Sequence, residues 1–208
     1  MEAASAAAAP RGVTRGLTSA PGRSPAQRDR RRRILAAATD LATEGGFDAV
    51  QMREVADRAD VALGTLYRYF PSKVHLLVCA LLERFEDAEV RQRTVPAPGD
   101  DAKDRVRHVL GGQTRALQRE PLLTEAMTRA FVFADGSVAA EIRRVEEVVS
   151  DLLTGAMAGP GGSQEDYRRT ARVLADVWLA ALVGWVTGRT TADDVWARLD
   201  DACELLVL

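Results

Sequence analysis

Apolar residues recur every three or four positions along most of the chain, which is the spacing of one face of an α-helix. The pattern begins after residue 33, where Ile34, Leu35 and Leu41 share a face. The pair Gly45-Gly46 ends that segment. No stretch shows the clean alternation of apolar and polar residues that a half-buried strand needs. The sequence therefore predicts an all-α fold, and it contains no internal repeats.

Breaks in this pattern divide the chain into a series of helices. Two short helices are expected at 52–59 and 63–69, separated by a turn at 60–62. Pro71 and Ser72 then prepare a longer helix, with Ser72 as its N-cap. The clearest break is PAPGDD at 96–101. Beyond it, helices are expected at about 101–119, 121–134, 137–157, 164–187 and 192–206.

The two short helices have the pattern of a helix-turn-helix, in which the second helix enters the major groove of DNA. The small side chain of Ala56 allows close approach, and Val55, Val61 and Leu66 fill the space between the helices. A turn of this kind often needs a left-handed residue, for which glycine is the usual choice. Asp60 stands there and tolerates that conformation better than most residues.

Two kinds of DNA contact are expected around this motif. Leu63, Gly64 and Thr65 lead the second helix and face the bases, because short side chains permit close approach to base edges. Phosphates are the expected partners of aromatic hydroxyls and cations. For Arg68 and the run RDRRRR at 28–33, a solvated surface charge is the alternative. The predicted DNA-contacting residues are Arg30, Arg31, Arg32, Gln51, Arg53, Leu63, Gly64, Thr65, Tyr67, Arg68, Tyr69 and Lys73.

The distribution of charge supports a basic binding module on an acidic body. The net charge is only −2, but residues 1–75 hold 12 Lys and Arg against 8 Asp and Glu, whereas 76–208 hold 16 against 22. Cys79 and Cys203 lie far apart in apolar segments and are expected to be reduced core residues. No apolar run could cross a membrane, and no signal peptide is expected, which favours a cytoplasmic protein.

An enzyme is not expected. His75 and His108 are the only histidines, and neither lies near Cys or acidic residues at a metal-binding spacing. The glycine-containing segments at 111–114 and 159–163 lack the pattern of a phosphate-binding loop. No nucleophile and base are suggested, so no catalytic residue, metal or cofactor is predicted.

The segment VQMREVADRADVALGTLYRYFPSKVHLL at 50–77 resembles the DNA-binding signature of the TetR family of transcriptional regulators. Within that family, PLLTEAMTRAFVFAD at 121–135 and ARVLADVW at 171–178 resemble the repressors of cholesterol catabolism in actinobacteria. The resemblance implies a homodimer on palindromic double-stranded operator DNA, released by a small-molecule inducer. For the cholesterol-linked group the inducer is a coenzyme A thioester of a steroid acid. The expected domains are a disordered tail at 1–26, a helix-turn-helix domain at 27–73 and a regulatory domain at 74–208.

Family members usually dimerise through their last two long helices. The apolar stripe of the segment 164–187 is wider than one buried face needs, although packing within one chain is the alternative. The expected interface residues are Leu174, Ala181, Gly184, Val195, Leu199, Ala202 and Leu206.

A ligand pocket is expected among the middle helices, because methionine adapts to irregular shapes and aromatic rings provide flat walls for a rigid polycycle. Its expected lining is Leu117, Met127, Phe131, Phe133, Trp178, Leu182 and Trp185, each of which could instead be a core residue. Arg115, Arg119 and Arg129 are candidate partners for the phosphates of a thioester. Two other functions remain open: a sensor of a drug or other lipid that controls efflux, and a constitutive architectural DNA-binding protein.

Overall fold

The computed structural model describes residues 24–207, and every regular element within them is a helix. Two one-turn 3₁₀ helices, η1 (Gly136–Val138) and η2 (Glu165–Tyr167), precede α7 and α8. The α-helices are α1 (Pro25–Ala49), α2 (Met52–Arg58), α3 (Leu63–Tyr69), α4 (Lys73–Thr94), α5 (Ala102–Gln118), α6 (Pro121–Val132), α7 (Ala139–Ala158), α8 (Arg168–Val186) and α9 (Ala192–Leu206). The prediction of an all-α fold is therefore confirmed.

The start of α1 differs from the prediction of a disordered tail through residue 26. Ser24 and Gln27 form a capping box, in which the Ser24 hydroxyl accepts from the Gln27 amide at 3.2 Å and the Gln27 side chain accepts from the Ser24 amide at 2.9 Å. Pro25 occupies the first helical position, where its fixed φ is favourable. The sequence Ser-Pro-x-Gln carries this signal, which composition alone obscures. The rest of the predicted tail lies outside the described residues.

Two glycines kink α1 near its end, at the place where the sequence predicts the helix to stop, and α1 continues beyond them to Ala49. Gly45 and Gly46 have non-helical backbone angles, and Gly46 adopts φ +70° and ψ −161°. Only glycine enters that region easily. The last turn of α1 therefore leaves the helix axis and carries Phe47 toward α6, where the carboxylate of Glu125 lies.

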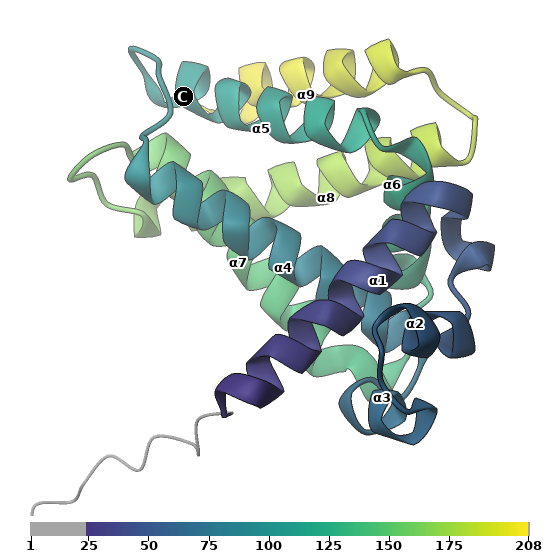
Figure 1. The fold of residues 1–208 in the computed structure, drawn as a ribbon. Helices are drawn as coiled ribbons and strands as arrows, with labels where there is room; N and C mark the ends of the chain where they lie inside the picture. The colour runs from purple at the N-terminus through teal and green to yellow at the C-terminus, as the bar shows by residue number, and fades with distance from the viewer. Residues whose placement is uncertain (1–23, 208) are drawn as a thin grey trace, which may run out of the picture.

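The helices form a small N-terminal head on a larger body. Figure 1 shows α2 and α3 at one end of the molecule, with α5, α8 and α9 at the other. Helix α4 belongs to both parts, since its first residues follow the head directly and it then packs along α6 and α7. The most extensive contact between head and body is that of α1 with α6. Within the described residues, no helix is long and apolar enough to cross a membrane.

We expect Gly46→Ala to lower the free energy of unfolding by about 1–3 kcal/mol, because alanine is strained at this backbone position. Its Cβ would also lie 3.2 Å from Oε2 of Glu125. Urea denaturation at equal protein concentrations measures the change.

The matched control is Gly112→Ala in the middle of α5, where a Cβ meets nothing within 4 Å. Here alanine should raise stability by about 0.5–1 kcal/mol, since glycine is a poor helix former. Equal effects at the two sites would show that the backbone of Gly46 is not constrained.

Candidate DNA-reading surface and ligand cavity

The turn between α2 and α3 has the geometry that the sequence suggests. Asp60 adopts φ +52°, and the Val61 amide donates to the Ala56 carbonyl at 3.0 Å. Leu66 and Phe70 are fully buried and hold α3 against the rest of the head. Arg33, which the sequence analysis did not single out, donates from Nη1 to the Ala59 carbonyl at 2.5 Å.

The outer face of the motif is free for a partner. Gly64 is exposed and a Cβ there would meet nothing within 4 Å, so a surface as close as a base edge can approach the backbone. Tyr67 is 45% exposed. The remaining predicted residues differ in exposure. Gln51, Arg53 and Arg68 are exposed, whereas Leu63, Thr65 and Tyr69 are half-buried.

The arginine run is only partly a surface for DNA. Arg31 lies over the Phe70 ring, 5.1 Å from its centre, and Arg32 pairs with Asp29 at 2.5 Å. Arg30 is half-buried and has no ion pair or hydrogen bond among the described residues. The run therefore combines packing of the head with one arginine, Arg30, that has no such contact in the part of the chain that the structure describes.

Lys73 does not occupy the place expected for a phosphate contact. Its ammonium group donates to the Phe47 carbonyl at 3.0 Å and lies 4.0 Å from the centre of the Phe47 ring. Burial lowers the pKa of this ammonium group, opposed in part by the negative charges of Asp48 and Glu125. In this conformation the end of α1 offers the nearer acceptor, and the phosphate contact of Lys73 stays a prediction.

Phe47 connects the head to the body through contacts with α6. Its amide donates to Oε2 of Glu125 at 3.1 Å, and the Arg129 guanidinium lies 4.4 Å from the ring centre. Arg129 also pairs with Asp48 at 3.6 Å and with Glu125 at 3.8 Å. Glu125 and Arg129 both lie on α6, so α6 and Lys73 together hold the last turn of α1.

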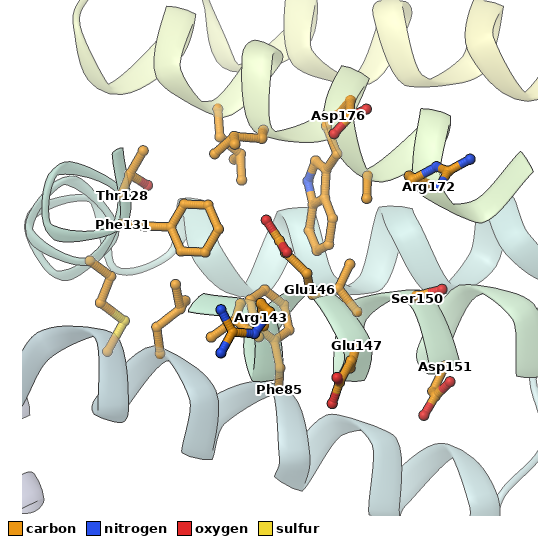
Figure 2. Close-up of a pocket in the computed structure, with 18 of the residues that line it drawn as sticks. Phe85, Thr128, Phe131, Arg143, Glu146, Glu147, Ser150, Asp151, Arg172 and Asp176 are labelled. Carbon is orange, nitrogen blue, oxygen red and sulfur yellow. The ribbon is translucent and has the colours of Figure 1, made fainter. Parts of the chain in front are cut away.

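The other face of α6 borders a cavity of about 810 Å³. Side chains from α4, α5, α6, α7 and α8 surround it, with an apolar part contributed mainly by α4, α5, α6 and α8 and charged groups contributed by α7 and α8. Figure 2 shows Thr128 and Phe131 at one end, and Arg172, Ser150 and Asp151 at the other. The space suits an amphipathic molecule, with its apolar portion toward α6.

Five of the seven residues predicted for the pocket line this cavity. They are Leu117, Met127, Phe131, Trp178 and Leu182. Phe133 is 75% exposed beyond the end of α6, and Trp185 is half-buried outside the lining, so both predictions are corrected. Helical spacing places Phe133 two residues beyond Phe131, on the opposite side of the helix.

The expected cations are also replaced. Arg115, Arg119 and Arg129 do not line the cavity, and Arg129 is used at Phe47. The cavity's arginines are Arg143, Arg168 and Arg172. Neither Arg143 nor Arg172 has an ion pair or hydrogen bond among the described residues, whereas Arg168 is paired with Glu165 at 2.8 Å.

Buried polar groups near the apolar end are few. The Thr124 hydroxyl donates to the Leu117 carbonyl at 2.7 Å, while Nε1 of Trp178 has no partner. No three His, Cys, Asp or Glu side chains in the described part of the chain are arranged to hold a metal ion.

The predicted dimer residues point mostly into their own chain. Leu174, Ala181, Gly184, Val195, Leu199 and Ala202 are buried, and Leu206 is half-buried. The six buried residues hold α8 and α9 to each other and to the body, so they are corrected to core positions, whereas Leu206 stays a predicted interface residue. The outer side of α8 instead carries Val173, Val177 and Ala180, and Leu205 on α9 is 78% exposed.

Comparison with known proteins extends these observations. Residues 34–79 match the N-terminal model for bacterial regulatory proteins of the tetR family, and 99–206 match the tetracyclin repressor-like C-terminal domain. The HTH-type transcriptional repressor KstR of Mycobacterium tuberculosis is 52% identical over 184 residues, which cover 88% of this chain and 83% of KstR.

Two solved structures have the same fold. A TetR transcriptional regulator from Rhodococcus sp. RHA1 is 34% identical, with a TM-score of 0.79, over 88% of this chain and 98% of that one. Thermus thermophilus FadR, a repressor solved with lauroyl-CoA, is 24% identical, with a TM-score of 0.66, over 85% and 93% of the two chains. The sequence signature, the helical head and body and these matches agree: the chain belongs to the TetR family of transcriptional regulators, which bind DNA and are not enzymes.

Proposed function

We propose that this protein is a repressor that binds a palindromic operator as a homodimer and is released by an amphipathic inducer, a coenzyme A thioester of a steroid acid. Genes of cholesterol or steroid catabolism are its proposed targets. The observation that carries the proposal is the double role of α6, which lines the cavity with Met127 and Phe131 and holds Phe47 with Glu125 and Arg129.

The DNA-binding part of the proposal rests on the exposed face of α3. Gly64, Tyr67 and Arg68 are open to solvent, while Leu66 and Phe70 fix the helix from behind. An α-helix presented in this way fits the major groove. Two such heads, related by a two-fold axis, would read the two halves of a palindrome.

The choice of ligand rests on the cavity and on the relatives. An apolar end of Phe85, Met127 and Trp178 can cover rings, and the unpaired Arg143 and Arg172 can meet phosphates outside it. The name of the 52% identical relative is that of a repressor, KstR, and the FadR structure holds lauroyl-CoA, itself an acyl thioester. A large thioester agrees with both the shape and the charges.

Induction follows because the ligand and the operator favour different positions of α6. A ligand that packs on Met127 and Phe131 favours the position of α6 that fits it best. The same helix positions Glu125 and Arg129, so the last turn of α1 must follow. If the ligand-bound arrangement spaces the two heads unsuitably for the operator, affinity for DNA falls by the coupling free energy between the sites.

A drug sensor is the second candidate, favoured by the carboxylates of Glu146, Asp151 and Asp176 at the cavity. Within residues 24–207 none of these three carboxylates forms an ion pair, so they offer negative charge to a cationic drug. A constitutive architectural protein is disfavoured by the cavity itself.

A melting-temperature screen should separate these candidates. A ligand present at 100 times its Kd raises stability by about 2.7 kcal/mol, because it binds only the folded protein. We expect steroid thioesters to raise the transition and to release operator DNA in a gel-shift assay, with the free steroid acids weaker. A transition moved only by cationic drugs would establish the drug sensor, and no release from DNA by any ligand would establish the architectural protein.

Glu125→Gln should weaken induction without abolishing ligand binding. The substitution weakens the charge-assisted hydrogen bond to the Phe47 amide, which is outside the cavity. We expect the ratio of operator Kd values with and without saturating inducer to fall about fivefold. Glu89→Gln, on α4 and paired with Arg93, is the control and should leave the ratio unchanged. An unchanged ratio for Glu125→Gln would remove the α6 contact from the mechanism.

A charge on the outer side of α8 should separate the dimer. Val173 is 44% exposed there, and Val173→Asp would bury a carboxylate between two copies, at a cost of several kcal/mol. Sedimentation should show a monomer. Val90→Asp, at a valine that is 60% exposed on α4, is the control and should remain dimeric. A dimeric Val173→Asp protein would place the interface elsewhere.

A further inference from the structure

The turn between α2 and α3 is unusual because it reverses the chain without glycine. Asp60 is the one non-glycine residue with a positive φ among residues 24–207. Aspartate enters this left-handed region more readily than most residues, but it still favours other conformations. The turn therefore needs support from outside the two short helices.

Arg33 supplies contacts at this position. Its Nη1 donates to the carbonyl of Ala59 at 2.5 Å and lies 3.4 Å from the carbonyl of Asp60. Neither carbonyl accepts a backbone hydrogen bond in the turn. On the other side of the guanidinium, Asp29 lies 3.5 Å from Nε and orients the group from within α1.

Position and charge both favour this arrangement. Ala59 is the C-cap of α2, where the carbonyls carry partial negative charge, so a guanidinium there is stabilising. Because Arg33 belongs to α1 and the turn immediately precedes α3, the contact fixes the direction of α3 relative to α1. The guanidinium is directed at protein carbonyls, which distinguishes it from an arginine available to phosphate.

We propose that Arg33 is a positioning residue for sequence recognition, which holds the turn in the left-handed conformation that glycine would provide by itself. The proposal deepens the proposed function, since it rests on α3 being the helix that reads DNA. Arg33 and Asp60 are then energetically coupled. Arg33 contributes strongly to the stability of the turn because position 60 is aspartate and not glycine.

The first test compares Arg33→Met with Arg30→Met in the full-length protein. Duplexes selected by the wild type from a random library, and random duplexes, are titrated at several salt concentrations. Arg33→Met should lose about tenfold in affinity for selected DNA and little for random DNA, with the salt slope unchanged. Arg30, a half-buried arginine with no ion pair or hydrogen bond to residues 24–207, is the control. Its loss should be similar on both DNAs, and the slope should fall by about one if it meets a phosphate.

The second test is rescue by glycine. Adding Asp60→Gly to Arg33→Met should restore most of the preference for selected DNA, because glycine adopts the turn conformation without assistance. Hydrogen exchange of the Val61 amide, which is bonded to Ala56, gives a readout that needs no DNA. Exchange should accelerate about tenfold in Arg33→Met and return toward the wild-type rate in the double variant.

Three results would overturn the proposal: equal losses on selected and random DNA for Arg33→Met, a reduced salt slope like that of a phosphate contact, or no rescue by glycine. Selection of no sequence by the wild type would overturn the proposed function, and with it the role of Arg33 in recognition. The exchange measurement would still decide whether Arg33 holds the turn, so the two failures are distinguishable.

Discussion

The contact on which the two halves of this molecule depend is the enclosure of Phe47. Helix α1 is kinked at Gly46, in a conformation available to glycine, and the kink turns the Phe47 peptide group toward the body. Glu125 accepts from its amide and Lys73 donates to its carbonyl, while Lys73 and Arg129 lie against its ring. Phe47 is half-buried, and each hydrogen bond from its peptide group to a charged side chain contributes about 1–3 kcal/mol. The end of α1 is therefore part of the body as well as of the head.

In the proposed mechanism, this enclosure links the cavity to a DNA-reading surface that the cavity does not touch. Helix α6 has apolar residues on one face, directed to the cavity, and Glu125 and Arg129 on another, directed to Phe47. A packed helix moves largely as a unit, because its neighbours leave few voids to absorb a local shift. A ligand that displaces the cavity-facing side of α6 therefore also displaces the side that contacts Phe47. The ion pair of Arg129 with Asp48 makes the contact directional, since a small rotation of α6 changes the distance between these two side chains.

The sequence predicts the helices well and the partners of individual side chains less well, for a physical reason. Periodicity shows which residues share a face, and it correctly indicates α2, α3, the turn at Asp60 and the N-cap Ser72. It does not show whether an apolar face packs on its own chain or on a second copy. Leu174 and Leu199 carry the apolar stripes of α8 and α9, but both stripes are used within the chain. Similarly, the residue type of Lys73 suits a phosphate, and only the tertiary position of Phe47 provides its actual acceptor.

The difference between position along the chain and position in the fold also decides which charged residues lie at the cavity. Cations near the cavity could not be chosen from the sequence, because Arg129 is closer along the chain to the pocket-lining Met127 than Arg172 is, yet faces away. In the fold, the charged groups lie on α7 and α8, while the apolar side chains of Met127 and Phe85 enclose the other end. A charged group placed at that end would lose its hydration without a compensating partner. Any ligand must therefore present its charge between α7 and α8 and its apolar body to α6, which is the helix that holds Phe47.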